Sequence, residues 1–421
     1  MKTAGIICEY NPFHNGHLYH INQTRQTAGA THTVGIMSGN FVQRGDIALF
    51  NKFDRAEFAV RHGIDLVIEL PTVYALSSAE YFAAGAIEIL NALGCVDLLS
   101  FGSECGRIES LEQTAELCIK AENSPELLRL LKAGNSYPAA MHDLIRKDNR
   151  NAAEVLAHPN NLLGIEYIKA LKASGSAIKP ITVLRSYAPH DSGITEDIFS
   201  SSSYLRELAE NAPPRTVPAG FNDYVPESLR EPYTELIKSG LTAAIGNLER
   251  TLLYKLRCQT AENLAQIRDV EQGLENVFIK ARKAVSLPEL MEYLKSRRYP
   301  HARLRRILLN MLLGIKREDM RHIKYIRVLA INEHGTQILR KAKETCKLPV
   351  VFSSKDLKNP SAVAARFAEI DALACDIYAL ACGSIQPSGT DFTHNPAGSP
   401  GGHRRAAGEP PAGKRGICPN A

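Results

Sequence analysis

The sequence predicts an α/β protein with an open parallel sheet and a second, mainly helical domain. Short apolar runs alternate with helix-like segments over the first 100 residues, which is the pattern of strands joined by crossover helices. Polar motifs follow the ends of these runs, and helical periodicity dominates from about residue 227 to residue 369. Because ligands bind at the carboxyl ends of strands in such sheets, we expect the motifs to meet at one edge.

The predicted strands are apolar throughout, which is typical of parallel strands that are covered on both faces. They are residues 4–8, 33–37, 66–70, 96–101 and 180–185. Helices are expected between the first strands at residues 54–62 and 79–93. Residues 106–150 are charged and mostly helical, so we interpret them as an insertion into a first domain of residues 1–212.

Prolines cluster near residues 212–226 and mark the start of the second domain. We expect this domain, residues 225–382, to be helical and basic, with helices over 262–284 and 287–295. The last 39 residues contain eight glycines and six prolines and almost no periodic apolar positions. Because such a composition is typical of disorder, residues 383–421 are predicted to form a disordered tail.

The composition of the 421 residues bounds the class of protein. The chain has 44% hydrophobic residues and no apolar run of the roughly 18 residues that a transmembrane helix needs. We therefore expect a globular protein without a membrane partner. No signal peptide is expected, because the N-terminus leads straight into a predicted strand. Nine scattered cysteines without a C-x-x-C pair favour reduced thiols in the cytoplasm and predict no metal site. The net charge of +5 permits an RNA partner without demanding one, and we expect no DNA partner.

The turn after the first predicted strand carries the strongest chemical signal. Residues 9–17 read Glu-Tyr-Asn-Pro-Phe-His-Asn-Gly-His and open a predicted helix. Gly16 lets the backbone approach a phosphate closely, and the first N–H groups of the helix attract an anion. His14 and His17 can donate hydrogen bonds to charge that builds up on the α-phosphate of ATP. The alternative is a turn that carries two solvated histidines.

A serine-rich segment before Arg206 is the second candidate for phosphate binding. Hydroxyl groups of Ser201 and Ser202 can donate to phosphate oxygens, and a guanidinium can neutralise the leaving pyrophosphate. The structural alternative is an N-cap cluster, in which Ser202 or Ser203 starts a helix. The two interpretations are compatible, because a phosphate can occupy the same end of the helix.

Other polar residues follow predicted strands. Gly102 lies where a nucleotide can approach the backbone, or it is a plain glycine between strand and loop. Glu69 lies at a strand end as either an active-site carboxylate or a structural partner, and Asp54 and Arg55 read as a pair on a helix surface. One polar loop follows a predicted strand and contains Ser38, Asn40, Gln43 and Arg44. This loop can line an acyl or cytidine pocket, or else it is simply solvated.

The densest basic patch lies in the second half of the chain. A tyrosine among arginines suits RNA, because the charges track phosphates and the ring stacks on an exposed base. The alternative is a solvated helix face. The patch comprises Arg297, Arg298, Tyr299, Arg303 and Arg306, and Lys316, Arg317, Arg321, Lys324 and Arg327 extend it.

The run from Glu9 to His17 resembles the HxGH signature of the nucleotidyltransferase superfamily, whose members attack the α-phosphate of ATP and release pyrophosphate. Together with residues 37–45, 65–71, 101–104 and 159–164, it resembles the bacterial tRNA(Met) cytidine acetate ligases over the chain up to about residue 380. The resemblance implies a Rossmann-like nucleotidyltransferase sheet and an acetyl-adenylate intermediate. It also implies that acetate and the wobble cytidine of elongator tRNA(Met) are the substrates. We expect Mg²⁺ to accompany ATP, because the tetra-anion needs neutralising.

By this resemblance His14, His17 and Arg206 are the catalytic residues. The residues expected to bind ATP are Ile7, Cys8, Glu9, Tyr10, Asn11, Pro12, Phe13, Asn15, Gly16, Leu18, Tyr19, His20, Gly102, Asn160, Asn161, Arg185, Ser201 and Ser202. Without the resemblance, the Asn160–Asn161 pair reads as a turn.

Two other functions stay open from the residues alone. An adenylyltransferase that makes a dinucleotide cofactor from ATP and a phosphorylated small molecule would use the same histidines without the basic helical half. An RNA-binding factor with a decayed nucleotide site is a third hypothesis, but the presence of both histidines, Gly16 and Arg206 argues against decay. The sequence after Asp376-Ile377-Tyr378 departs from the resemblance, for which a reading-frame change near Cys382 is one hypothesis and divergence the other.

Overall fold

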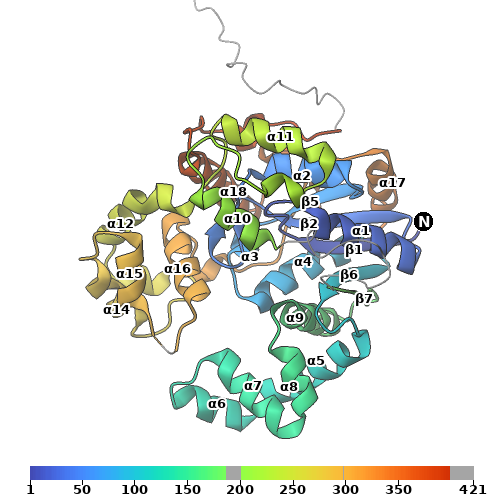
Figure 1. The fold of residues 1–421 in the computed structure, drawn as a ribbon. Helices are drawn as coiled ribbons and strands as arrows, with labels where there is room; N and C mark the ends of the chain where they lie inside the picture. The colour runs from blue at the N-terminus through green and yellow to red at the C-terminus, as the bar shows by residue number, and fades with distance from the viewer. Residues whose placement is uncertain (186–200, 297, 399–421) are drawn as a thin grey trace, which may run out of the picture.

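The computed structural model describes residues 1–185, 201–296 and 298–398. Seven strands form one sheet in the order β7-β6-β1-β2-β5-β8-β9, with helices on both faces (Figure 1). All neighbouring pairs are parallel except β5 and β8, which are antiparallel. The strands are β1 (Thr3–Cys8), β2 (His32–Ser38), β5 (Leu66–Leu70), β6 (Leu98–Ser103), β7 (Lys179–Leu184), β8 (Ile326–Ile331) and β9 (Val350–Val351).

The prediction of an open α/β sheet is confirmed, and the five predicted strands are present. The apolar runs become strands because both faces of β1, β2 and β5 are buried. Ile7, Ile36 and Ile68 pack with α4 (Ala79–Leu93) and α9 (Pro159–Ala173) on one face. Their neighbours along each strand pack with α1 (Asn15–Ala28) and α2 (Lys52–Arg61) on the other face.

Four helices form the insertion, which the sequence predicted to be mostly helical. They are α5 (Ile108–Glu122), α6 (Pro125–Lys132), α7 (Tyr137–Asp148) and α8 (Arg150–Leu156). Figure 1 shows them grouped at one end of the molecule, below the sheet, where α5 and α8 contact α9. The insertion therefore extends from the edge of the sheet that carries β6 and β7.

Helices dominate the second half of the chain, as predicted, but they do not form a purely helical domain. Strands β8 and β9 lie inside the range predicted to be helical and join the sheet beside β5. The predicted helix over 262–284 is two helices separated by a loop. The helices of this half are α10 (Ser202–Asn211), α11 (Glu227–Lys238), α12 (Glu249–Arg257), α13 (Ala261–Gln266), α14 (Leu274–Ala281), α15 (Leu287–Leu294), α16 (His301–Leu313), α17 (Glu333–Ala342), α18 (Ala362–Ala381) and α19 (Thr390–Thr393).

Short elements complete the fold. A small hairpin of β3 (Phe41–Val42) and β4 (Asp46–Ile47) follows β2, and the one-turn helix α3 (Thr72–Ala75) follows β5. The 3₁₀ turns are η2 (Phe221–Asp223), η3 (Ile245–Leu248), η4 (Arg317–Asp319) and η5 (Ser354–Asp356). Within the described ranges, no helix combines the length and the apolar character that a membrane crossing requires.

The prediction of a disordered tail from residue 383 is wrong for residues 383–398. Asp391 is fully buried, and its carboxylate pairs with Lys52 at 2.6 Å and with Arg327. The backbone oxygen of Ala397 accepts a hydrogen bond of 3.1 Å from the N–H of Ile331 in β8. A buried ion pair and a backbone bond therefore hold an irregular segment that composition alone marks as disordered. Residues 399–421 lie outside the described part of the chain.

Candidate active site

The turn between β1 and α1 holds two imidazoles with defined hydrogen-bonding roles. His14 is the N-cap of α1, and its Nδ1 accepts a hydrogen bond of 3.0 Å from the N–H of Gly16. The Nδ1 of His17 accepts 3.3 Å from the N–H of His14, so the two residues form a reciprocal cap. Because both Nδ1 atoms are acceptors, the proton of each neutral ring is on Nε2. The turn therefore presents two stacked rings, 3.8 Å apart between centroids, each with an Nε2–H donor.

Burial keeps both rings neutral. Burial, together with nearby Arg185 and Arg206, lowers the pKa of His14 to about 3. Burial, His14 and Arg185 hold the pKa of His17 well below its ordinary range. At neutral pH the pair therefore consists of uncharged donors, and the positive charge of the site is left to the two arginines.

Several residues predicted to bind ATP have buried side chains that shape the turn. Tyr10 and Phe13 are at most 2% exposed, and their rings contact the ring of His17 at 4.9 and 5.7 Å between centroids. His20 points into the sheet, where its Nε2 lies 3.0 Å from the hydroxyl of Ser100. The rings of Tyr10 and Phe13 therefore hold the imidazole of His17 in place.

Helix α10 brings Arg206 to the turn. The Nη1 of Arg206 donates 2.7 Å to the backbone oxygen of Asn11, and its Nη2 donates 3.1 Å to the hydroxyl of Ser203. The hydroxyl of Ser202 lies 3.5 Å from the backbone oxygen of Pro12. Ser201 caps the helix, one residue earlier than predicted, by accepting from the N–H of Tyr204. The two predicted phosphate motifs therefore lie side by side, although Ser201 comes 189 positions after Pro12 in the chain.

The ends of β6 and β7 meet the start of α9 in one network. The Glu104 carboxylate accepts from the N–H groups of Asn160 (3.2 Å) and Asn161 (2.8 Å) and from the side-chain amide of Asn160 (2.6 Å). Arg185 donates 3.0 Å to the Oδ1 of Asn160. A Cβ on Gly102 would lie 2.9 Å from the side chain of Arg185, so the glycine leaves room for this arginine. The asparagine pair therefore opens a helix beside the site and is not an isolated turn.

The loop after β2 joins the active-site turn to α16. The backbone N–H of Gln43 donates a hydrogen bond of 2.8 Å to Oε1 of Glu9. The backbone oxygen of Gln43 accepts a hydrogen bond of 3.2 Å from Nη1 of Arg306. A Cβ on Gly45 would lie 2.6 Å from the backbone nitrogen of Arg306, so only glycine permits this close contact. Arg44 is exposed at the tip of the hairpin.

The other two residues of the predicted acyl or cytidine pocket are buried. Ser38 and Asn40 are at most 2% exposed, and Oδ1 of Asn40 accepts 2.7 Å from the N–H of Lys52. The loop therefore has an inner part that supports its shape, while Gln43 and Arg44 form its outer part.

Arg55 and Glu69 both have structural roles, of which the sequence analysis missed the first and left the second open. Arg55 was predicted to lie on a helix surface, but it is fully buried and donates to the backbone oxygens of Glu9, Ser38, Gly39 and Phe50. The apolar residues Phe58 and Ala59, three and four positions later on α2, carried the signal that it faces inward. Both oxygens of Glu69 pair with Lys52 or Arg327, so Glu69 is a structural partner.

The predicted RNA patch divides into exposed and buried parts. Arg298 and Arg303 lie over the ring of Tyr299, and all three contact the carboxylate of Glu271. Arg306 is buried beside Asp269, at 3.6 Å, and Arg327 lies in β8, so neither belongs to the exposed surface. The position of Arg297 is outside the described residues.

Comparisons with known proteins now bear on this geometry. A family model described as HIGH Nucleotidyl Transferase matches residues 1–391. The tRNA(Met) cytidine acetate ligase of Thermoanaerobacter sp. (strain X514) is 38% identical over 404 residues, with 94% of this chain and 99% of the relative covered. That of Acetivibrio thermocellus is 35% identical over 416 residues with the same coverage. This chain belongs to the tRNA(Met) cytidine acetate ligase family.

Solved structures agree with that assignment. The crystal structure of Thermotoga maritima TmcAL bound with alpha-thio ATP is similar to this chain with a TM-score of 0.85 and 30% identity. The comparison covers 94% of this chain and 99% of the Thermotoga chain. The apo form of the same protein is similar with a TM-score of 0.85 and 31% identity.

Membership of the ligase family also corrects the prediction about the tail. The family model extends to Asp391, beyond Cys382, so the sequence does not leave the family pattern at Cys382. The residues between these two positions are also packed against the rest of the protein, as the burial of Asp391 shows.

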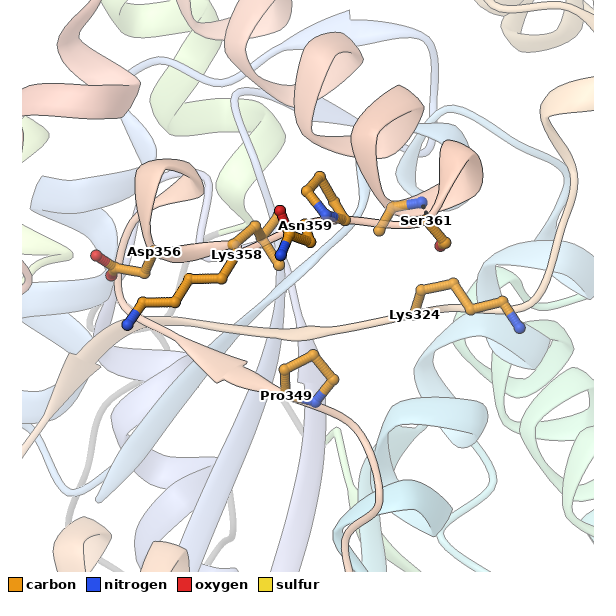
Figure 2. Close-up of a pocket in the computed structure, with 9 residues that line it drawn as sticks. Lys324, Pro349, Asp356, Lys358, Asn359 and Ser361 are labelled. Atoms are coloured by element: carbon orange, nitrogen blue, oxygen red, sulfur yellow. Dashed lines mark hydrogen bonds between the residues drawn. The ribbon is translucent and has the colours of Figure 1, made fainter.

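A cavity of about 410 Å³ lies elsewhere in this ligase-family chain, between the segments that flank β8 and β9 and the start of α18 (Figure 2). Its lining includes Lys324, Asp356, Lys358 and Ser361 and none of the residues predicted to bind ATP or to act in catalysis. The candidate active site therefore rests on the convergence of motifs at the strand ends and not on this cavity.

Proposed function

We propose that this protein is an ATP-dependent acetate ligase that forms N4-acetylcytidine at the wobble position of elongator tRNA(Met). Family membership supports the reaction, since the relatives are named tRNA(Met) cytidine acetate ligase. The observation that carries the chemistry is the pair of neutral imidazoles of His14 and His17, each with an Nε2–H donor at a helix N-terminus. That arrangement suits an anionic phosphate on which charge develops.

In the first step a carboxylate oxygen of acetate attacks the α-phosphorus of ATP. The bond from this phosphorus to the oxygen that bridges the α- and β-phosphates breaks, and pyrophosphate leaves. His14 and His17 donate to the oxygens of the α-phosphate, where charge builds up in the transition state. Arg206, with Ser201 and Ser202 at the start of α10, binds the departing β- and γ-phosphates.

The rest of the nucleotide lies along the strand ends beside the turn. We assign its binding to the backbone of residues 7–20 and to Gly102, Asn160, Asn161 and Arg185, which the hydrogen-bond network of Glu104 holds together. Mg²⁺ bound to the phosphates of ATP would neutralise part of their charge beside Arg206, Ser201 and Ser202.

In the second step the exocyclic amine of cytidine attacks the acetyl carbonyl carbon, and AMP leaves. Arg298, which is exposed, and Arg303, which is partly buried, contact tRNA phosphates, and Tyr299 stacks on a base. The contacts of Gln43 with Glu9 and Arg306 support this assignment, because they connect α16 to the ATP site. Arg306 itself is buried, so we assign it to support of the loop.

We expect the protein to act in the cytoplasm, where its tRNA substrate and ATP are found. The cysteines of the described residues are all free thiols, which fits a reducing compartment.

An ATP–pyrophosphate exchange assay with acetate tests the first step. The proposal predicts exchange that requires acetate, and acetylation of cytidine once tRNA is added. Transfer of AMP to a phosphorylated metabolite, with no exchange in acetate, would instead identify a cofactor adenylyltransferase. Binding of tRNA with neither reaction would identify an RNA-binding factor.

A further inference from the structure

The second step of the proposed reaction has a requirement that the phosphate-binding residues do not meet. When the cytidine amine attacks the acetyl carbonyl, its nitrogen gains positive charge and must lose a proton. General-base catalysis of such a transfer contributes about 10²–10⁴-fold to a rate. We therefore expect, near the α-phosphate, a base with a lone pair that accepts no hydrogen bond from the protein.

The carboxylate of Glu9 is positioned for this role. Glu9 directly follows β1, five residues before His14, and its side chain is partly buried. Its Oε1 accepts the N–H of Gln43, and the guanidinium of Arg55 binds its backbone oxygen. Its Oε2 accepts no hydrogen bond from the described residues, so one carboxylate oxygen is fixed and the other is available.

The charges around Glu9 place it beside the phosphate site. The cationic groups that face it are Arg206 of α10, Arg44 of the hairpin and Arg55 of α2. Arg206 also acts on His14, so the carboxylate and the imidazole share one arginine. The titratable neighbours Cys8 and Tyr167 stay neutral, because burial raises the pKa of each.

Burial also makes Glu9 a better base. It raises the pKa of the Glu9 carboxyl above its ordinary value, although the N–H of Gln43 and the three arginines oppose this. A raised pKa increases the basicity of the ionised form, and pKa values near the working pH suit proton transfer. The ionised form predominates above this pKa, so the proton transfer slows as the pH falls through it.

Other candidate bases at these strand ends are already engaged. In the imidazoles of His14 and His17 the Nδ1 atoms accept backbone N–H groups, and the Nε2 atoms carry protons. Both oxygens of Glu69 lie in a buried ion network, and both oxygens of Glu104 accept N–H groups of α9. Among the carboxylates described at the ends of β1, β5 and β6, Glu9 is the one with a free oxygen.

We propose that Glu9 is the general base of acetyl transfer, an inference that rests on the proposed ligase function. The amine nitrogen forms a bond to the acetyl carbon, and the bond from that carbon to the AMP oxygen breaks. The nitrogen gives one proton to Oε2 of Glu9, and AMP leaves with the electron pair of the broken bond. Glu9 then returns the proton to solvent, and the products are N4-acetylcytidine and AMP.

The Glu9→Gln variant tests this role because its amide oxygen still accepts the N–H of Gln43 but takes up no proton. Glu210→Gln is the matched control, since Glu210 is an exposed carboxylate of α10 near Arg206. Glu210 is not among the residues predicted to bind ATP or to act in catalysis. Acetate-dependent ATP–pyrophosphate exchange reports adenylate formation. A single turnover, in which enzyme preincubated with ATP and acetate is mixed with limiting elongator tRNA(Met), reports acetyl transfer.

We expect Glu9→Gln to keep exchange within about threefold and to slow transfer about 100-fold or more, with loss of the rise in rate with pH. Glu210→Gln should keep both rates. Transfer at the wild-type rate, or an equal fall of both half-reactions, overturns the assignment of Glu9. Absence of acetate-dependent exchange in the wild-type protein would instead contradict the ligase function, so the two failures are distinguishable.

Discussion

Substitution of Asp391 by asparagine probes the buried ion network that joins the C-terminal segment to the sheet. Lys52, Glu69, Arg327 and Asp391 carry two positive and two negative charges, and each side chain is at most 2% exposed. Asparagine has nearly the same shape but no charge, so two buried cations would share the single carboxylate of Glu69. Removal of one partner from a buried ion pair costs about 3–5 kcal/mol.

We therefore expect Asp391→Asn to lower the free energy of unfolding by about 3–5 kcal/mol in urea titrations followed by circular dichroism. Glu369→Gln is the control, because Glu369 pairs with Arg366 at 3.0 Å but is 68% exposed. Such a surface pair contributes about 0–1 kcal/mol. A loss for Asp391→Asn no larger than that of the control would refute the reasoning.

The pH dependence gives this prediction a second readout. The cations of Lys52 and Arg327 hold the pKa of Asp391 well below its ordinary range. A lowered carboxyl pKa stabilises the folded state above the ordinary value of about 3.9, and the stabilisation is lost as the pH falls towards the folded-state pKa. The difference in stability between wild type and Asp391→Asn should therefore be full at neutral pH and narrow below pH ~4.

Four further substitutions test other parts of the site. His14→Asn keeps an N-cap acceptor but not the Nε2–H, so acetate-dependent ATP–pyrophosphate exchange should fall about 100-fold with little change in the urea midpoint. Arg55→Lys should lower the free energy of unfolding by roughly 2–5 kcal/mol, because one ammonium group leaves buried carbonyls without donors. Arg298→Gln and Arg303→Gln should each weaken tRNA binding in a filter assay and lower the salt slope by about one, while exchange stays unchanged.

The local parts of the fold and the site were predictable from the sequence. Strands β1, β2 and β5 are continuous apolar runs. The residues of the turn with His14 and His17 lie within nine consecutive positions of the chain. Their positions at the strand ends followed from the topology of parallel sheets. The reciprocal caps that leave two Nε2–H donors needed the structure, because they depend on the rotation of each ring.

The missed features depend on partners far apart in the chain. Strand β8 contains Arg327, and this charge is tolerated in a buried strand only because Glu69 and Asp391 neutralise it. Asp391 in turn orders a segment that is rich in glycine and proline. Arg55 was missed for a related reason, since its partners are backbone oxygens that leave no trace in residue types.

The central claim is that free acetate, activated by ATP, is transferred to cytidine in elongator tRNA(Met). The most direct measurement incubates the purified protein with ¹³C-labelled acetate, ATP, Mg²⁺ and an elongator tRNA(Met) transcript, followed by mass spectrometry of the nucleosides. We expect heavy N4-acetylcytidine that requires ATP and disappears in His14→Asn. The account would be contradicted if the cytidine stayed unacetylated with labelled acetate and became acetylated when acetyl-coenzyme A was supplied instead.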